Sequence, residues 1–195
     1  MKALAVLLLV GLLAPAAFAG LDPATDSFGV YFDTDGNTNC TTAAPFELVT
    51  AYLTLMNPAG PTNGFECSVS VAGVPHVVLS TVIEAGPGCH VDKDVSSGDF
   101  AVACGSNFAA PPSGAMILVA WTLLLQEPGE LLFHVGPHPI PSLPGGLPVV
   151  VGDGVLRLCN VASGDPGLPV AGINAANCPV SDEASSFGRV KSLFR

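Results

Sequence analysis

The sequence predicts an all-β protein: a single β-sandwich of about nine strands, spanning residues 20–180, followed by a short C-terminal helix. Glycine and proline account for 22 and 18 of the 195 residues and are spread along the whole chain, where they interrupt helices. Between them lie short apolar runs bounded by turn residues, which is the pattern of strands in a sandwich. Six cysteines indicate disulfides in an exported protein.

The first five strands are expected where apolar runs end at turn residues. They are residues 27–32, before Asp-Thr-Asp-Gly; 46–56, before Asn-Pro; 64–71, after Asn-Gly; 75–83, before Glu-Ala-Gly-Pro-Gly; and 99–104, between two glycines. Side chains alternate across a strand, so one set within 46–56 is expected to face the core. That set is Val49, Ala51, Leu53 and Leu55.

The remaining strands follow the same rule. Residues 115–125 form the longest apolar run of this part of the chain and predict a buried strand. Residues 130–135 lie between Pro-Gly and Gly-Pro, while 148–152 and 155–159 lie between the proline-rich segment and Ser-Gly-Asp-Pro-Gly-Leu-Pro. The proline-rich segment 136–146 is expected to run as an extended crossover between the two sheets.

Residues 1–19 predict export. A lysine near the start precedes an apolar run from Leu4 to Leu13, and small residues lead to a cleavage position after Ala19. The run is about half of the roughly 20 residues that a membrane-spanning helix needs. We therefore expect a signal peptide, and a secreted or periplasmic protein with no membrane span after its removal.

The cysteines are expected to form three disulfides. They lie after the signal peptide, at Cys40, Cys67, Cys89, Cys104, Cys159 and Cys178. Many pairings are open to six cysteines. We favour neighbours, namely Cys40 with Cys67, Cys89 with Cys104 and Cys159 with Cys178, because each bond would close one loop or hairpin. A zinc site is disfavoured because no Cys-x-x-Cys spacing occurs.

The loop after the first strand carries candidate calcium ligands. Asp33, Asp35 and Asn37 match the first three ligand positions of an EF-hand, but a threonine replaces the required glycine and no helix is expected on either side. An irregular calcium site with these residues and Asn39 is one interpretation. A tight turn is the other, because Asp-Gly and Asn favour turns.

Two other groups of potential metal ligands are weaker candidates for a binding site. Asp92, Asp94 and Asp99 form a second acidic cluster, but a lysine sits inside it. The histidines are His76, His90, His134 and His138. The last two are four residues apart, yet the glycine and prolines around them prevent the helix that would align them as zinc ligands.

Composition narrows the function classes. A formal charge of -10 and a pI near 4.4 exclude nucleic-acid binding. No Gly-x-Ser-x-Gly motif is present, and the single tryptophan, Trp121, lies in a buried-looking strand and not on an exposed sugar platform. We therefore expect a secreted, non-catalytic module for extracellular binding, adhesion or assembly, with a protein partner or further copies of itself. The alternatives are a secreted hydrolase with an unrecognised site and a calcium-stabilised structural domain.

The C-terminal segment, residues 181–195, differs from the rest. A serine at Ser186 can cap a short helix that places apolar residues on one face and packs against the sandwich. Those apolar residues are Phe187, Val190 and Phe194. The cations Arg189, Lys191 and Arg195 are the candidate interaction residues of this segment.

Several stretches resemble known proteins. FGVYFDTDGNTNC, APFELVTAYLTLMNP and GFEC, together with the ending SSFGRVKSLFR, resemble a family of uncharacterised exported bacterial proteins that finish on an aromatic-Gly-x-Val-Lys-x-Leu-aromatic-Arg segment. VTAYLTLMNP followed by GFECSVSV is more distantly similar to cohesin-type modules and related jelly-roll sandwiches. The first resemblance implies export; the second implies a jelly-roll or cohesin-like sandwich with a scaffold or adhesion role, and it identifies no partner-binding residue.

Overall fold

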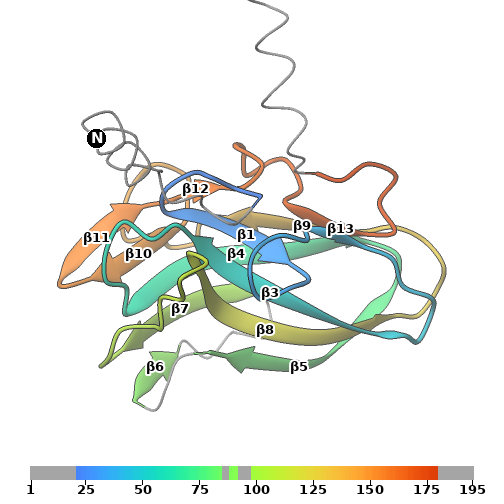
Figure 1. Cartoon of the computed structure of the whole chain (residues 1–195), viewed down its shortest axis with the longest axis horizontal. Coiled ribbons are helices and arrows are strands. Elements are labelled where there is room, and N and C mark those ends of the chain that lie inside the picture. The colour runs from blue at the N-terminus through green and yellow to red at the C-terminus, as the bar shows by residue number, and fades with distance from the viewer. Residues whose placement is uncertain (1–20, 85–87, 92–97, 180–195) are drawn as a thin grey trace, which may run out of the picture.

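Two β-sheets pack face to face in the computed structural model, which describes residues 21–84, 88–91 and 98–179 (Figure 1). The strands are β1 (Ser27–Tyr31), β2 (Cys40–Thr41), β3 (Leu48–Met56), β4 (Gly64–Gly73), β5 (His76–Ile83), β6 (Cys89–Val91), β7 (Asp99–Cys104), β8 (Ala115–Leu125), β9 (Leu131–Gly136), β10 (Val149–Gly152), β11 (Val155–Leu158), β12 (Asn160–Val161) and β13 (Ala171–Ile173). Within these ranges, no helix has the length and apolar character needed to cross a membrane.

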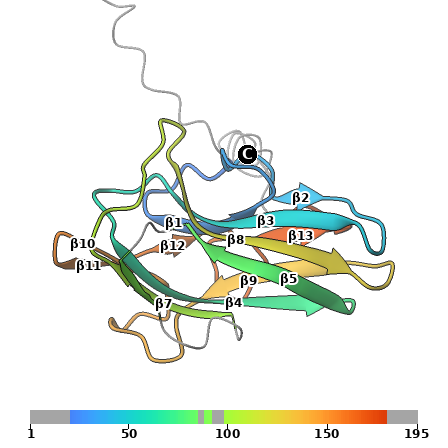
Figure 2. The ribbon, with the colours of Figure 1, turned by 90° about the horizontal axis from the view of Figure 1, so that it is seen from below.

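The two sheets are built from strands that are far apart in the chain. The five-stranded sheet has the order β12-β1-β3-β8-β5. The eight-stranded sheet has the order β11-β10-β4-β9-β13-β2, with β7 paired to β4 and β6 paired to β7. Figure 2 shows β3, β8 and β5 in one layer and β4, β7 and β9 in the other. β5 is therefore a terminal strand of its sheet.

All the strands predicted from the sequence are present, with ends that agree within about two residues. The core-facing set of β3 is also confirmed, because Ala51, Leu53 and Leu55 are fully buried and Val49 packs against the core. The two-sheet sandwich is thus confirmed. The structure adds the short strands β2, β6, β12 and β13, and the expected C-terminal helix lies outside the described residues.

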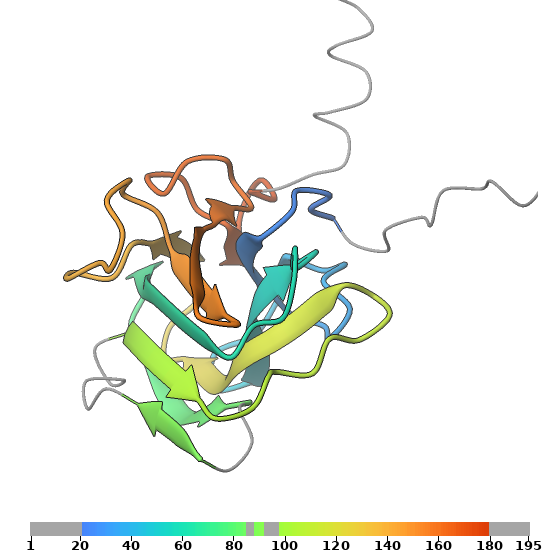
Figure 3. The ribbon, with the colours of Figure 1, turned by 90° about the vertical axis from the view of Figure 1, so that its left-hand side faces the viewer.

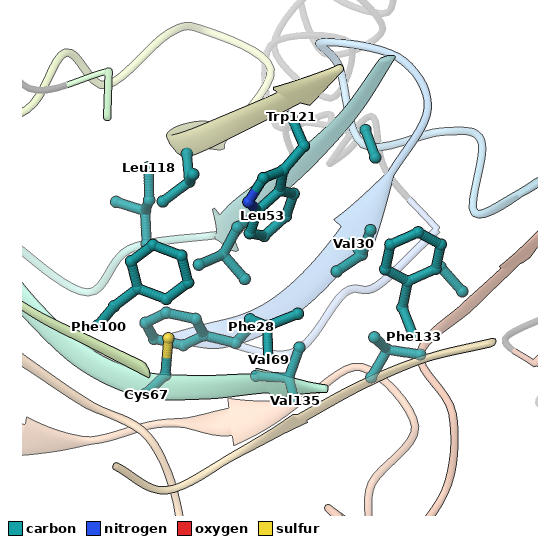
Figure 4. Packing of buried hydrophobic residues seen from close by; sticks show 14 of the residues in the cluster. Phe28, Val30, Leu53, Cys67, Val69, Phe100, Leu118, Trp121, Phe133 and Val135 are labelled. Carbon is teal, nitrogen blue, oxygen red and sulfur yellow. The ribbon is translucent and has the colours of Figure 1, made fainter. Parts of the chain in front are cut away.

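An aromatic cluster fills the space between the layers. Phe65 lies at its centre, with ring centroids 6.4 Å from Phe28, 6.1 Å from Phe100 and 5.9 Å from Phe108. Trp121 extends the cluster through a tilted contact with Phe100 at 5.9 Å. Figure 4 shows Phe28, Phe100 and Trp121 among the buried side chains that lie between the two sheets. Burial of such large rings supplies much of the hydrophobic stabilisation of a small sandwich.

The disulfides differ from the predicted pairing. Cys89 pairs with Cys104 as predicted, across β6 and β7. Cys40 pairs with Cys178, so the predicted bonds from Cys40 to Cys67 and from Cys159 to Cys178 are wrong. The reason is topological, because β2 and β13 run side by side in parallel and bring the two ends of the domain together. Two disulfides fit an oxidising compartment.

The proline-rich segment also differs from its prediction. It joins β9 to β10, which both belong to the eight-stranded sheet, so it does not cross between the sheets. Ser142 anchors it, because its backbone amide and its hydroxyl both donate to the carboxylate of Glu66 on β4. The segment returns to its own sheet because both strands pair with the same strand, β4.

One ion pair fastens the β11 edge to the start of β1. Arg157 Nε donates to Asp26 Oδ2 at 2.8 Å, and the second guanidinium nitrogen reaches Thr62 Oγ1 at 3.1 Å. Asp26 also accepts from the backbone amide of Ala59 at 2.9 Å. The only cation of β11 is thereby held against the loop between β3 and β4. Figure 3 shows the blue N-terminal strands lying beside these orange and red C-terminal segments.

Candidate functional site

Strand β5 presents apolar side chains to solvent along an edge of the sandwich. It pairs with β8 on one side and is the last strand of its sheet. Its exposed apolar side chains, which we call the β5 surface, are Val77, Val78, Leu79 and Val82. The strand contains no lysine, proline or acidic residue, which are among the devices that protect an edge from pairing with another chain.

A β-bulge shapes this edge. The register between β5 and β8 shifts between Val78 and Ser80, so Leu79 is the extra residue. Val78 then lies opposite Leu123 and Thr81 opposite Trp121, and both partners are buried. Val78 and Thr81 therefore face the space between the sheets, while the bulged Leu79 is 55% exposed.

Beneath β5 the two sheets leave a hollow of about 510 Å³. Its walls come from β4, β5, β8 and β9, and it opens at the sandwich edge. The lining residues are Val69, Ser70, Val71, His76, Val78, Thr81, Gly98, Trp121, Leu123 and Phe133. Trp121 is 8% exposed and packs against Phe100, so its indole joins the hollow to the aromatic core. The lining combines apolar side chains with the polar groups of Ser70, His76 and Thr81, so the hollow can receive apolar side chains of a ligand and offer them a few polar contacts.

A second hollow, of about 270 Å³, contains residue types that a hydrolase could use, so its geometry bears on the hydrolase alternative. Glu66, His90 and Ser142 all line it, together with apolar side chains of β4, β7, β10 and β11, Leu156 of β11 among them. In a catalytic triad the serine hydroxyl donates to a histidine. Here the Ser142 hydroxyl donates to Glu66 Oε2 at 2.7 Å, and that hydrogen bond anchors the proline-rich segment. The contact between Ser142 and Glu66 in this hollow is therefore accounted for by its role in anchoring the proline-rich segment.

The loop after β1 uses Asp33 to hold a turn. Asp33 Oδ1 accepts from the backbone amides of Asp35 at 2.8 Å and Asn37 at 3.0 Å, and Gly36 has a φ of 72°. Burial alone would raise the pKa of Asp33, but hydrogen bonds from Thr38 and from the backbone of the loop outweigh it and lower the pKa. This carboxylate is therefore already engaged by its own loop.

Asp33→Ala is expected to lower the free energy of unfolding by at most about 1 kcal/mol, because partly exposed hydrogen bonds contribute little each. Asp33 has a lowered pKa in the folded state, so its contribution is present above the ordinary pKa of aspartate, about 4, and is lost as the pH falls through the folded value. Denaturant titrations of both proteins at neutral and acidic pH measure this difference.

A calcium comparison distinguishes the two interpretations of this loop. If Asp33 serves only the turn, the stability difference stays the same with millimolar calcium and with excess chelator. A melting temperature that rises with calcium in the parent protein, and does not rise in Asp33→Ala, would instead establish an ion site. Asp33→Asn is the control, because its amide oxygen keeps an acceptor for the loop amides.

The other predicted ligands are dispersed. Asn39 is buried and its side chain donates to Val170 O at 3.4 Å, on the way into β13. Asp99 starts β7, while Asp92 and Asp94 lie outside the described residues. In the described ranges, no three or more His, Cys, Asp or Glu side chains gather in a way that holds a metal ion. The histidines are on separate elements or loops, and Arg189, Lys191 and Arg195 lie outside the described residues.

The β5 surface was not among the residues predicted from the sequence. The strand itself was predicted, but its place at the end of a sheet depends on long-range pairing. One feature of the sequence does point to it: His-Val-Val-Leu-Ser-Thr-Val-Ile lacks the alternation of apolar and polar residues that a half-buried strand shows. Such a run is typical of a strand covered on both faces, whereas Val77, Val78, Leu79 and Val82 are exposed here.

Comparisons with known proteins find similarity at the level of architecture. No protein-family model matches the sequence, and no curated protein matches it. Among solved structures, the second type II cohesin module of the ScaA adaptor scaffoldin of Acetivibrio cellulolyticus gives a TM-score of 0.45 at 12% identity, covering 82% of this chain and 97% of the module.

Two further cohesins are similar to a comparable degree. A type II cohesin domain from the Acetivibrio cellulolyticus cellulosome gives a TM-score of 0.44 at 18% identity, covering 77% of this chain and 96% of the domain. A cohesin module of a Clostridium perfringens family 33 glycoside hydrolase gives 0.41 at 12% identity, covering 69% and 90%. Likenesses of this degree assign no partner and no interface to this chain.

Proposed function

We propose that this chain is a non-catalytic extracellular binding module that recognises an extended, apolar segment of a partner protein by adding it as a strand beside β5. The observation that carries the proposal is the β5 surface, which lies on an edge strand without lysine, proline or acidic residues, beside a hollow lined by both apolar and polar side chains. Two disulfides fit a module that works in an oxidising environment.

Strand addition combines two sources of affinity. Among the described residues β5 pairs only with β8, so its other edge can offer backbone amides and carbonyls to an incoming strand, whatever that strand's sequence. Specificity comes from pockets that receive alternate side chains of that strand. The hollow beneath β5 can receive apolar side chains that point inward, where Val78 and Trp121 would contact them. A partner segment with apolar residues at every second position therefore fits both features.

The sole tryptophan provides a direct readout of binding. Trp121 lines the hollow, so a side chain that enters displaces water from the indole and changes its emission. We would titrate the purified, oxidised protein with a panel of extended peptides in which apolar and polar residues alternate. Binding peptides should lose affinity roughly tenfold or more when a central residue becomes proline, because proline removes a ladder hydrogen bond.

Val78→Arg should weaken binding of these peptides roughly tenfold or more, because it places a cation at the mouth of the apolar hollow. Leu156→Arg is the matched control: Leu156 is 43% exposed on β11, the terminal strand of the other sheet. The control should bind within about twofold of the parent protein. If no peptide changes the Trp121 emission, or if both variants weaken binding equally, strand addition at β5 is wrong.

A further inference from the structure

Two buried cysteines remain outside the disulfides described above. Cys67 on β4 is fully buried, Cys159 is 1% exposed, and both carry free thiols in the structure. The other cysteines are joined to each other, Cys40 to Cys178 and Cys89 to Cys104. Cys67 and Cys159 are therefore the only partners left for one another.

The strand register places both thiols at the same level of the core. Val149 of β10 lies opposite Glu66 on one side and Leu158 on the other. The residue before Val149 is Pro148, whose carbonyl accepts from the backbone amide of Cys159 at 2.9 Å. In the same register, the residue of β4 that lies level with Pro148 is Cys67, the neighbour of Glu66. Both cysteines are buried, and Figure 4 shows the Cys67 sulfur directed into the core near Phe28 and Phe100.

Two strands in a flat ladder separate such residues by about 10 Å, which is too far for a disulfide. Cys159 is not part of a flat ladder. Leu158 pairs with β10 in the eight-stranded sheet, while Asn160 pairs with Ser27 in the five-stranded sheet. The chain thus passes from one layer to the other at Cys159. This residue therefore lies out of the plane of β4, toward the interior that the Cys67 side chain enters.

The partner strand of β4 also changes at Cys67. Glu66 lies opposite Val149 of β10, whereas Ser68 lies opposite Gly136 of β9. Between the two strands the proline-rich segment leaves the sheet, so neither β9 nor β10 spans the position of Cys67 on this side. The break in the ladder on this side of β4 therefore falls at Cys67, level with Cys159 of the β11–β12 junction.

The electrostatics of the two thiols agree with their proximity. Burial raises the pKa of the Cys67 thiol well above its usual value, and the neighbouring Cys159 raises it further. Burial, and then Asp26, raise the pKa of Cys159 to about 12. Both thiols are also buried in the folded protein, where an external oxidant does not reach them. A bond between these residues is therefore expected to form before the core closes.

We propose that Cys67 and Cys159 form a third disulfide, which joins β4 to the β11–β12 junction and so links the two sheets through the core. It forms during folding by exchange with a thiol–disulfide oxidoreductase or oxidised glutathione. One cysteine thiolate attacks the oxidant disulfide and releases a thiol, and the second cysteine then resolves the mixed disulfide. Two thiols of the chain lose two protons and two electrons, and the oxidant disulfide is reduced to two thiols.

The test is a thiol count on the full chain, expressed into an oxidising compartment and quenched with acid. The protein is unfolded in denaturant without reductant, treated with iodoacetamide, digested and analysed by mass spectrometry. We expect no alkylated cysteine, and a cross-linked peptide pair that contains Cys67 and Cys159. Alkylation of both residues in the parent protein, or a cross-link from either of them to a different cysteine, would overturn the proposal.

Single variants provide the matched comparison. Cys67→Ser should leave Cys159 as a newly alkylated residue, and Cys159→Ser should do the same for Cys67. Cys89→Ser, which releases Cys104 from an assigned bond, shows the size of the signal for one freed thiol. Because alkylation is carried out in denaturant, the count holds even for a variant that folds poorly. A variant that exposes no new thiol contradicts the proposed bond.

Discussion

Replacement of both Cys40 and Cys178 by serine is expected to lower the free energy of unfolding by about 4–5 kcal/mol. The bond joins residues separated by 138 positions, so its loss restores a large conformational entropy to the unfolded chain. It also removes the covalent link between β2 and the segment after β13, which leaves the short parallel pair and the hydrogen bonds between Asn174 and Ala43 to hold the two segments together. Denaturant titration of the oxidised variant and parent protein measures the difference.

The Cys89–Cys104 bond is the matched control for this experiment. It closes a separation of only 15 residues, so removing it with serines is expected to cost about 3 kcal/mol. Both variants replace a bonded pair with two hydroxyls, which leaves the length of the closed loop as the main difference. An equal or smaller loss for the Cys40 and Cys178 variant would contradict the entropic argument, and would indicate that the unfolded chain holds these ends close together.

Phe65→Ala is expected to lower the free energy of unfolding by about 3–5 kcal/mol. The side chain is 3% exposed and is the ring that contacts Phe28, Phe100 and Phe108 together. Its removal takes away apolar burial and also leaves a cavity, because tightly packed rings between two sheets relax only partly. Thermal and denaturant unfolding of the oxidised proteins measure the loss.

Phe46→Ala controls for the same chemical change at the surface. Phe46 is 69% exposed and outside the strands, so its replacement is expected to change stability by at most about 0.5 kcal/mol. Phe65→Leu keeps most of the apolar volume and should recover part of the loss. Similar losses for Phe46→Ala and Phe65→Ala would show that the aromatic cluster is not where the sandwich obtains its stability.

The strands of four or more residues were predictable because each is a local apolar run with turn residues at its ends. β8 is an uninterrupted apolar run bounded by Pro-Pro-Ser-Gly and Glu-Pro-Gly, and β10 and β11 flank Asp153-Gly154, where both residues have positive φ. The strands β2, β12 and β13 were not predictable, since two or three residues hold no period. They exist because a distant strand presents a free ladder at that place.

The disulfides and the β5 surface were missed for a related reason. Pairing neighbours is correct for Cys89 and Cys104, which face each other across one hairpin. It fails for Cys40, whose partner is brought close by the parallel pairing of β2 with β13. Likewise, the missing alternation in His76–Ile83 sets the strand apart but does not determine that it ends a sheet. Positions set by long-range pairing are decided by the whole chain and not by a segment.

The pairing of early strands with late ones also determines when the domain can fold. β1 needs β12, about 130 residues further on, and β2 needs β13 at a similar distance. For a chain that emerges amino-terminus first, whether from the ribosome or from an export pore, neither sheet can be completed until almost all of it has appeared. Such a high contact order implies slow folding and a waiting period in which apolar strands are exposed. The domain should therefore depend on holding chaperones until its last strands arrive.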